Sequence, residues 1–228
     1  WVLNADDPEV MGMGFDVSGT TRTFATARRA DAWLDRDRAA LMLDGRILMP
    51  REDLALLGDH NVANALAASL AAQAAGLSPA GIREGLDTFR ALAHRLEPVR
   101  EVGEVLWIND SKATNIAATR MALRAMTRPF VLLLGGRHKG EPYTALADDL
   151  EHCRVVIAYG EARAMIEHDL DQLVPVSGME TFEEVMDQAR SLARPGDGVL
   201  LSPACSSFDM FRNYEERGAT FRRLVEAM

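Results

Sequence analysis

Short apolar runs interrupted by turn residues make up the first part of the chain. Thr20–Ala27 and Ala39–Met49 have the composition of strands, and the first four residues, Trp1 to Asn4, also read as a buried strand. Within Ala39–Met49, the Asp44-Gly45 pair separates two apolar triplets, an arrangement typical of a β-hairpin turn. This part of the chain therefore predicts a small sheet that contains a hairpin.

An alanine-rich segment with the composition of a helix follows. Residues 60–76 contain no glycine or proline before Gly76, which stands where a helix would end in a left-handed residue. Ser78 and Pro79 then have the arrangement of an N-cap and a first helical residue. They predict a second helix that ends near Phe89.

After Leu96, apolar runs of strand length alternate with segments of helix length. The predicted strands are Val105–Ile108, Phe130–Leu134, Val155–Tyr159 and Gly198–Leu201. The predicted helices are Asn115–Met126, Tyr143–Leu150, Glu161–Asp169, Phe182–Ala193 and Tyr214–Ala227. This alternation predicts an α/β fold with a parallel, doubly wound, Rossmann-like sheet. We place the domain boundary at Arg95–Pro98 and assign the domains to residues 1–95 and 96–228.

The overall composition narrows the class of protein. Hydrophobic residues make up 48% and charged residues 26% of the 228 residues, as in ordinary globular proteins, and no apolar run is long enough to span a bilayer. The net charge of −9 argues against non-specific nucleic-acid binding, which needs a basic surface. Two cysteines are too few for a disulfide framework and fit a reducing compartment, so we expect a cytoplasmic protein. The five histidines show no metal-ligand spacing, so we assign no metal site to this chain.

Polar loops follow four of the predicted strands. They are Asn109–Thr114, Gly135–Gly140, Gly160–Glu161 and Ser202–Ser207. Because ligands of open parallel sheets bind beyond the carboxyl ends of the strands, we expect these loops to form one site. Three of the four contain hydroxyls or cations, which suits a small substrate with charged groups.

The first of these loops combines the most different groups. Asp110, Lys112 and Thr114 place a carboxylate, an ammonium and a hydroxyl within five positions, where an ordinary turn would have Gly, Pro or Asn. The alternative is a helix start with Thr114 or Asn115 as its N-cap. We favour a binding role, because a cap needs only one of these groups.

For two other loops, an ordinary structural role is an alternative to ligand binding. In Gly135–Gly140 the glycine pair would allow a ligand to approach, and Lys139 offers a point cation, but a glycine turn with solvated charges would look the same. Ser206 and Ser207 precede a helix-like start at Phe208. There they would cap a helix, bind an anion at its N-terminus, or do both.

Two further sets of polar residues lie before the predicted boundary. Asn61 and Asn64 are three residues apart on the predicted helix and so face the same side, where their amides suit a nucleobase edge. The alternative is that Asn61 caps the helix. Arg95, next to His94, suits a bidentate phosphate contact or a structural ion pair.

Several of these motifs together resemble the Mur ligase superfamily, and in particular its D-glutamate-adding branch. Within the segment Trp107–Asn115, the sequence NDSKATN is close to diagnostic for that branch. Four other motifs follow the family's order and spacing and extend the resemblance over the whole chain: Gly58–Asn64, Ala93–Arg95, Leu133–Gly140 and Leu200–Asp209. His138 is a departure, because the family often has Asp there.

The resemblance implies an ATP-dependent ligase of peptidoglycan synthesis. In that family, ATP phosphorylates the terminal carboxylate of UDP-N-acetylmuramoyl-L-alanine, and the amine of D-glutamate attacks the acyl phosphate. ADP and phosphate are released, and Mg²⁺ neutralises the phosphates. Residues 1–95 would be the back half of the central ATP-binding domain, and residues 96–228 the C-terminal, amino-acid-binding domain. We also expect a monomer.

The resemblance also implies a role for individual residues. Asn61 and Asn64 would contact adenine, Arg95 the phosphates and Asp110 the ribose. The residues around D-glutamate would be Lys112, Thr114, Lys139, Ser207, Phe208 and Tyr214. The catalytic residues would be Arg95, Lys112 and Lys139.

One part of the family's machinery has no counterpart in the sequence. The 228 residues contain no G-x-x-x-x-G-K-[ST] phosphate-binding loop, and the chain starts abruptly at Trp1, so we expect that loop and the magnesium ligands to lie upstream. Other hypotheses are a different Mur-type or folylpolyglutamate-type ligase and a catalytically inactive nucleotide- or amino-acid-binding domain. A dinucleotide-binding Rossmann module would need glycines after its first strand, and the loop after Ile108 has none.

Overall fold

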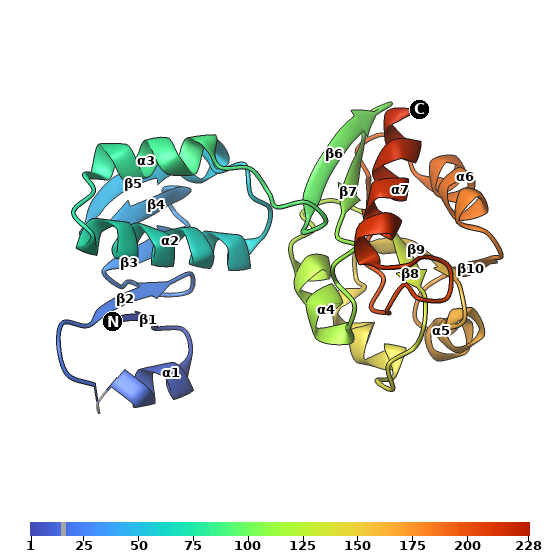
Figure 1. Cartoon of the computed structure of the whole chain (residues 1–228), viewed down its shortest axis with the longest axis horizontal. Coiled ribbons are helices and arrows are strands. Elements are labelled where there is room, and N and C mark those ends of the chain that lie inside the picture. Colours follow the sequence, from blue (N-terminus) through green and yellow to red (C-terminus); the bar gives the residue numbers. More distant parts are fainter. Residues whose placement is uncertain (15–16) are drawn as a thin grey trace. The chain divides into compact units, whose positions relative to one another are not determined.

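The computed structural model describes residues 1–14 and 17–228. The chain folds as two compact units, Trp1–Arg90 and Ala91–Met228 (Figure 1). Each unit has its own sheet and its own helices. The assignment of residues 1–95 and 96–228 to two domains of a ligase remains a prediction.

A five-stranded sheet with its strands in chain order forms the first unit. The strands are β1 (Val2–Asn4), β2 (Arg22–Ala25), β3 (Ala32–Asp35), β4 (Ala40–Leu43) and β5 (Arg46–Pro50). β1, β2 and β3 are parallel, and β3, β4 and β5 are antiparallel. β4 and β5 form the predicted hairpin, and its turn residues Asp44 and Gly45 both have positive φ, as a two-residue hairpin turn requires.

Two elements of this unit were not predicted, and one was described wrongly. β3 is only four residues long and is held by its ladders to β2 and β4. The short helix α1 (Pro8–Met13) has a local start signal, with Asp7 as its N-cap before Pro8, but no prediction was made from it. β1 is a strand, as predicted, but its residues are half-buried rather than buried. The reason is its position at the end of the sheet, where it pairs with β2 alone among the described strands.

Two helices complete the first unit. α2 (Asp59–Ala74) packs on β1, β2, β3 and β4. It ends as predicted at Gly76, where φ is +93° and the backbone makes the pair of hydrogen bonds of a Schellman motif. α3 (Pro79–Thr88) begins as predicted, with the Ser78 hydroxyl accepting from a backbone N–H of its first turn.

A six-stranded sheet forms the second unit, in the order β10-β9-β8-β11-β7-β6. The strands are β6 (Glu97–Val102), β7 (Val105–Asn109), β8 (Phe130–Gly135), β9 (Cys153–Tyr159), β10 (Val176–Met179) and β11 (Gly198–Leu201). β6 pairs antiparallel with β7, and the other strands are parallel. The predicted doubly wound α/β fold is therefore confirmed, with two edge strands, β6 and β10, that were not predicted.

Helices cover both faces of this sheet (Figure 1). Alternate strand residues, among them Trp107 and Leu133, form one core with α6 (Phe182–Leu192) and α7 (Tyr214–Glu226). On the other face, α5 (Arg163–Leu170) packs on β8, β9 and β10. α4 (Ile116–Arg124) begins after Asn115, whose side chain caps it, so Asn115 and not Thr114 is the cap.

The predicted α-helix Tyr143–Leu150 is wrong in type. The segment is a 3-10 helix, Tyr143–Asp149. Its two buried residues, Tyr143 and Leu146, are three positions apart. That spacing places them on the same side of a helix with three residues per turn, so both reach the core in a 3-10 conformation.

The predicted helix start at Phe208 is also wrong. Residues after Ser207 form a turn, in which the Ser207 carbonyl accepts hydrogen bonds from the N–H groups of Met210 and Phe211 at 3.2 and 2.8 Å. α7 begins only at Tyr214, because Asn213 supplies the capping side chain. Ser206 and Ser207 therefore do not cap a helix, and no helix N-terminus forms an anion site there.

Candidate functional site

Four loops meet at one edge of the second sheet. β7, β8, β9 and β11 are parallel, so the loops that follow them leave from the same edge, as predicted. Arg137, after β8, exchanges two backbone hydrogen bonds with Ser206, after β11, at 2.8 and 3.2 Å. The Arg137 guanidinium pairs with the carboxylate of Glu161, after β9, at 2.9 and 3.0 Å. Three of the loops are thus bonded directly to one another.

The glycine pair after β8 allows this close packing. Gly135 and Gly136 have φ values of +151° and +128°, which side chains rarely allow. A Cβ atom at Gly135 would collide with the carbonyl oxygen of Tyr159, and one at Gly136 with the carbonyl oxygen of Ser206. Both positions therefore require glycine, so that this loop fits between its two neighbours.

Asp110 is held inside the site. Its side chain accepts a hydrogen bond from the Leu96 N–H at 3.1 Å and another from the Ser202 hydroxyl at 2.9 Å, and the residue is only 7% exposed. Burial raises the pKa of this carboxyl to about 7, although both hydrogen bonds and the charge of Arg95 act to lower it. A carboxyl group that titrates near neutrality is typical of functional sites.

The segment before β6 has an unusual backbone conformation. His94 and Leu96 have φ values of +65° and +42°, a region that costs residues other than glycine roughly 1–3 kcal/mol each. The His94 ring Nδ1 lies 3.0 Å from the Asn109 amide nitrogen, and the His94 N–H donates to the Glu97 carboxylate at 3.0 Å. These bonds, with that from Leu96 to Asp110, hold the backbone on both sides of Arg95, which is exposed.

Arg217 lies beneath the loops and joins three of them. Its side chain is fully buried, and it donates to the Ser111 hydroxyl at 3.0 Å, the Ser111 carbonyl at 2.9 Å, the Cys205 carbonyl at 3.2 Å and the Gly135 carbonyl at 3.4 Å. Such partners are needed because a buried donor without one is costly. Our sequence reasoning missed Arg217. Ser111 and Gly135 are 106 and 82 residues away from it in the sequence, so no local pattern links them.

The structure brings four of the six predicted D-glutamate residues together in two pairs. The Lys139 ammonium donates to the Thr114 hydroxyl at 3.3 Å. The Lys112 ammonium lies 5.4 Å from the centre of the Tyr214 ring, within the range of a cation–π interaction. Both lysines are exposed. The 228-residue sequence contains no other lysine.

The other two predicted D-glutamate residues lie in the loop after β11. Ser207 is buried, and Phe208 is 62% exposed, which is unusual for a large apolar side chain. The backbone bridge between Ser206 and Arg137 holds this loop beside the loop that carries Lys139.

The predicted nucleotide residues divide between the two units. Asn61 and Asn64 lie on α2 in the first unit, whereas Arg95 and Asp110 lie in the second. Asn64 is exposed, and the half-buried Asn61 donates through its amide to the Leu57 carbonyl at 2.8 Å. The alternative that Asn61 is the N-cap is wrong, because Gly58 occupies that position.

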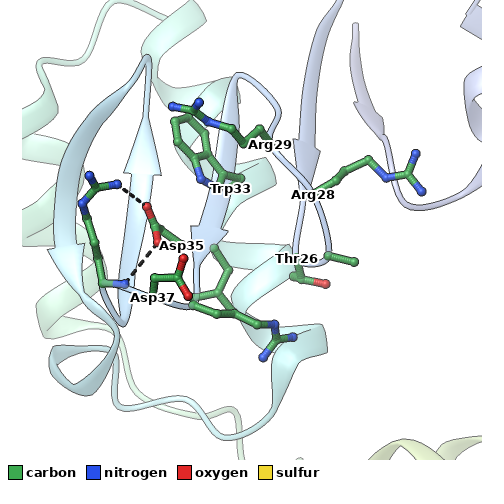
Figure 2. A pocket seen from close by; sticks show the side chains of 10 residues that line it. Thr26, Arg28, Arg29, Trp33, Asp35 and Asp37 are labelled. Carbon is green, nitrogen blue, oxygen red and sulfur yellow. Dashed lines mark hydrogen bonds and ion pairs between the residues drawn. The ribbon is translucent and has the colours of Figure 1, made fainter.

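A pocket of about 450 Å³ in the first unit adds charged groups that the sequence had not singled out (Figure 2). It is lined by Thr26, Ala27, Arg28, Arg29, Trp33, Leu34, Asp35, Arg36, Asp37 and Arg38. Three of its four arginines pair with carboxylates: Arg28 with Asp6, Arg36 with Asp59 and Arg38 with Asp35. Figure 2 shows the fourth, Arg29, lying against the Trp33 ring, 5.2 Å from its centre. Since its arginines already have partners, we read this pocket as a surface ion-pair network and assign it no ligand.

Residues 1–14 and 17–228 contain neither a cluster of metal-ligating side chains nor a membrane-spanning helix. No group of three or more His, Cys, Asp or Glu side chains there is arranged to hold a metal ion. No helix in these residues combines the length and the apolar character needed to cross a bilayer.

Comparison with known proteins identifies the family. Residues 94–205, which include the loops that carry Lys112 and Lys139, match the family described as Mur ligase, glutamate ligase domain. This chain belongs to the Mur ligase family. The family resemblance of the sequence motifs is thereby confirmed.

Curated Mur ligases match the whole chain. The UDP-N-acetylmuramoylalanine–D-glutamate ligase of Salinibacter ruber is 44% identical over 237 residues, which cover 100% of this chain and 52% of that protein. The enzyme of the same name from Solibacter usitatus is 38% identical over 228 residues, with the same two coverages. This chain therefore spans about half the length of the relatives that it matches.

Solved structures of related ligases share the fold. UDP-N-acetylmuramate-alanine ligase MurC from Thermotoga maritima matches 99% of this chain and 51% of its own, with a TM-score of 0.67 and 18% identity. The bifunctional folylpolyglutamate synthase/dihydrofolate synthase from Yersinia pestis matches 97% of this chain and 52% of its own, with a TM-score of 0.66 and 18% identity. At this identity, these likenesses establish the fold alone.

Proposed function

We propose that this chain is part of an ATP-dependent ligase that joins D-glutamate to UDP-N-acetylmuramoyl-L-alanine in cytoplasmic peptidoglycan synthesis. The observation that carries the proposal is the 44% identity, over the whole chain, to a UDP-N-acetylmuramoylalanine–D-glutamate ligase. The site supports the same reaction. An amino acid with two carboxylates needs cations and hydroxyls, and both lysines of the chain lie in the loops of this site.

The proposed reaction forms an amide through an acyl phosphate. ATP transfers its terminal phosphoryl group to the carboxylate of UDP-N-acetylmuramoyl-L-alanine. The amine of D-glutamate then attacks the activated carbonyl carbon, and the tetrahedral intermediate collapses with loss of phosphate. The part of this chemistry that falls to the second unit is to hold D-glutamate so that its amine can reach that carbon.

The two lysine pairs are the proposed carboxylate anchors. Lys139 with Thr114 would hold one carboxylate of D-glutamate, and Lys112 beside Tyr214 the other, since an ammonium suits a carboxylate as a point charge. Ser207 and Phe208, from the adjacent loop, would complete the enclosure. Lys112, Lys139 and Arg95 are the residues to which we assign catalytic roles.

The nucleotide part of the proposal uses residues of both units. Asn61 and Asn64 would pair with adenine and Arg95 with the phosphates. Asp110 would meet the ribose, and although it already accepts two hydrogen bonds, a carboxylate can accept more. Mg²⁺ would neutralise the phosphates, with its protein ligands in the part of the ligase that this chain does not span. A monomer, with residues 1–95 in the ATP-binding domain and residues 96–228 in the amino-acid-binding domain, belongs to the same proposal.

Nuclear magnetic resonance of the two lysine side chains tests the proposal directly. Reductive methylation with ¹³C labels Lys112 and Lys139 and retains their charges. Because the chain has two lysines, the spectrum contains few signals and each can be assigned by substitution. D-Glutamate should shift both signals, and L-glutamate should bind at least about tenfold more weakly, a difference of about 1.4 kcal/mol. A stronger response to L-glutamate would favour a folylpolyglutamate-type ligase, and no response to either enantiomer would contradict the amino-acid assignment.

Kinetics of the complete ligase test the role of Lys139. Lys139→Ala should raise the KM for D-glutamate at least about tenfold and leave the KM for ATP nearly unchanged, because it removes one charge-assisted contact to the amino acid. Arg190→Ala is a matched control, since it also removes an exposed cation. Arg190 lies in the last turn of α6, which leads into the start of β11 and so lies toward the opposite edge of the sheet. Equal effects of Lys139→Ala on both KM values would mean that Lys139 serves the nucleotide.

A further inference from the structure

A buried tyrosine fixes one end of the loop that carries Lys139. Tyr143 is 1% exposed, and its hydroxyl lies 3.2 Å from His138 Nδ1 and 2.9 Å from Cys205 Sγ. The His138 and Tyr143 rings pack with their centres 5.4 Å apart. The Tyr143 N–H donates to the Asp169 carboxylate, on α5, at 2.9 Å. Tyr143 is therefore held through its backbone and its hydroxyl, and it holds His138 in turn.

The neighbouring residue on the other side of His138 is also fixed. Arg137 is bonded through its backbone to Ser206 and through its guanidinium to Glu161. Lys139 is thus the first residue of the loop after two anchored positions, and it is exposed. Its backbone position follows from those anchors, and its ammonium reaches the Thr114 hydroxyl from there.

We propose that Tyr143 is a positioning residue for amino-acid binding: its hydroxyl holds His138 and thereby places the Lys139 ammonium beside Thr114, where a substrate carboxylate binds. The proposal rests on the proposed function for the identity of the ligand. Its physical basis is pre-ordering, because a side chain that is already in place need not be ordered when the ligand binds.

The hydrogen-bonded series from His138 through Tyr143 to Cys205 has neutral groups at its buried end. Burial raises the pKa of the Cys205 thiol to about 11 and also raises the pKa of Tyr143, so both keep their protons at neutral pH. Cys205 therefore acts as a weak hydrogen-bond partner of the tyrosine and not as a thiolate. The position of His138 then depends on one ordinary hydrogen bond and on the packing of two rings.

Tyr143→Phe isolates the hydroxyl, because it retains the ring that packs in the core. Tyr159→Phe is the matched control. Tyr159, on β9, is equally buried, but among the described residues no hydrogen bond joins its hydroxyl to His138 or to another residue of the loop that carries Lys139. In the absence of any ligand, Tyr143→Phe should speed amide hydrogen exchange at Arg137 and Tyr143, whose N–H groups donate to the Ser206 carbonyl and to the Asp169 carboxylate. It should also move the ¹³C-methyl signal of Lys139, while that of Lys112 stays in place. D-Glutamate affinity should fall about fivefold, the effect of one neutral hydrogen bond. Tyr159→Phe should change none of these.

A double-mutant cycle separates positioning from a general loss of structure. His138→Ala should weaken D-glutamate binding to a similar extent, and Tyr143→Phe should add nothing in that background, because both variants interrupt the same connection. Additive losses would overturn the proposal, as would a Tyr143→Phe variant with unchanged exchange, an unchanged Lys139 signal and unchanged affinity. If the unsubstituted chain does not respond to D-glutamate, the proposed function fails, and the ligand-free exchange and Lys139 signal still decide the role of Tyr143.

Discussion

Buried polar side chains and exposed cations have separate roles at the residue scale. Asp110, Arg217 and Tyr143 are buried, and each bonds to at least two segments that are distant in the sequence. Lys112 and Lys139 are exposed, and their neighbours are a ring and a hydroxyl rather than carboxylates. The buried groups therefore fix the loops, and the exposed lysines are the groups that we propose for ligand binding.

Asp110 should make the stability of the second unit depend on pH. Its folded-state pKa is about 7, raised by burial from an ordinary value of 3.8. Between these pH values the folded chain binds a proton that the unfolded chain has released. The contribution of Asp110 to the free energy of unfolding is therefore fully present below about pH 4 and is lost as the pH rises toward 7. The loss is at most about 1.4 kcal/mol per pH unit.

Urea unfolding of Asp110→Asn at several pH values between 4 and 8 measures this effect. An amide cannot ionise but can still accept from Leu96 and donate to Ser202. The variant should therefore gain stability relative to the unsubstituted chain as the pH rises from 4 to 7. Asp187→Asn, at an exposed position on α6, should show no such trend. A constant difference between Asp110→Asn and the unsubstituted chain would show that folding does not raise the pKa of Asp110.

At the scale of elements, the loop after β8 is packed between the loops after β9 and β11, and this packing leads to a prediction about stability. Gly136→Ala should lower the free energy of unfolding by at least about 3 kcal/mol, because it combines a positive φ with a collision at the Ser206 carbonyl. Gly140→Ala, in the same loop, also has a positive φ but meets nothing within 4 Å. It should cost only about 1–2 kcal/mol. Chemical unfolding of both variants checks the difference, and equal losses would mean that the loops separate to admit the methyl group.

The helix boundaries that the sequence predicts correctly are set by capping or end residues at those boundaries. Ser78 caps α3, Asn115 caps α4, and Gly76 ends α2, and each acts within a few residues of its own position. The edge strands β6 and β10 were not predicted. β6 contains Pro98 and several charged residues, and β10 contains Gly178, so neither has a strong local signal, and each is held by one neighbouring strand.

The same distinction applies to the candidate site. Lys112, Thr114 and Lys139 could be predicted, because the loops that carry them follow recognisable strands and resemble family motifs. Arg217 and Tyr143 could not, because their roles depend on partners such as Ser111 and Cys205, which are 106 and 62 residues away. The residues around Arg217 in the sequence indicate only a helix, and those around Tyr143 indicate only a buried position.

At the scale of the whole molecule, the residues proposed to bind ligands are distributed unequally between the two units. All six proposed D-glutamate residues belong to Ala91–Met228, whereas the proposed nucleotide residues come from both units. On the proposed assignment, binding of the amino acid should be measurable on this chain without a nucleotide, whereas binding of ATP should need residues outside the second unit.

This division leads to a prediction about activity. The chain alone should release no ADP above background when it is given ATP, Mg²⁺, D-glutamate and UDP-N-acetylmuramoyl-L-alanine. It spans about half of its curated relatives, and its sequence contains no G-x-x-x-x-G-K-[ST] loop, while phosphoryl transfer depends on positioned phosphates and metal ions. A coupled ADP assay, with the complete ligase as positive control, measures this. The same preparation should still show the D-glutamate shift of the Lys139 signal, which demonstrates that it is folded. Clear turnover by the chain alone would mean that residues such as Arg95 position the phosphates without that loop.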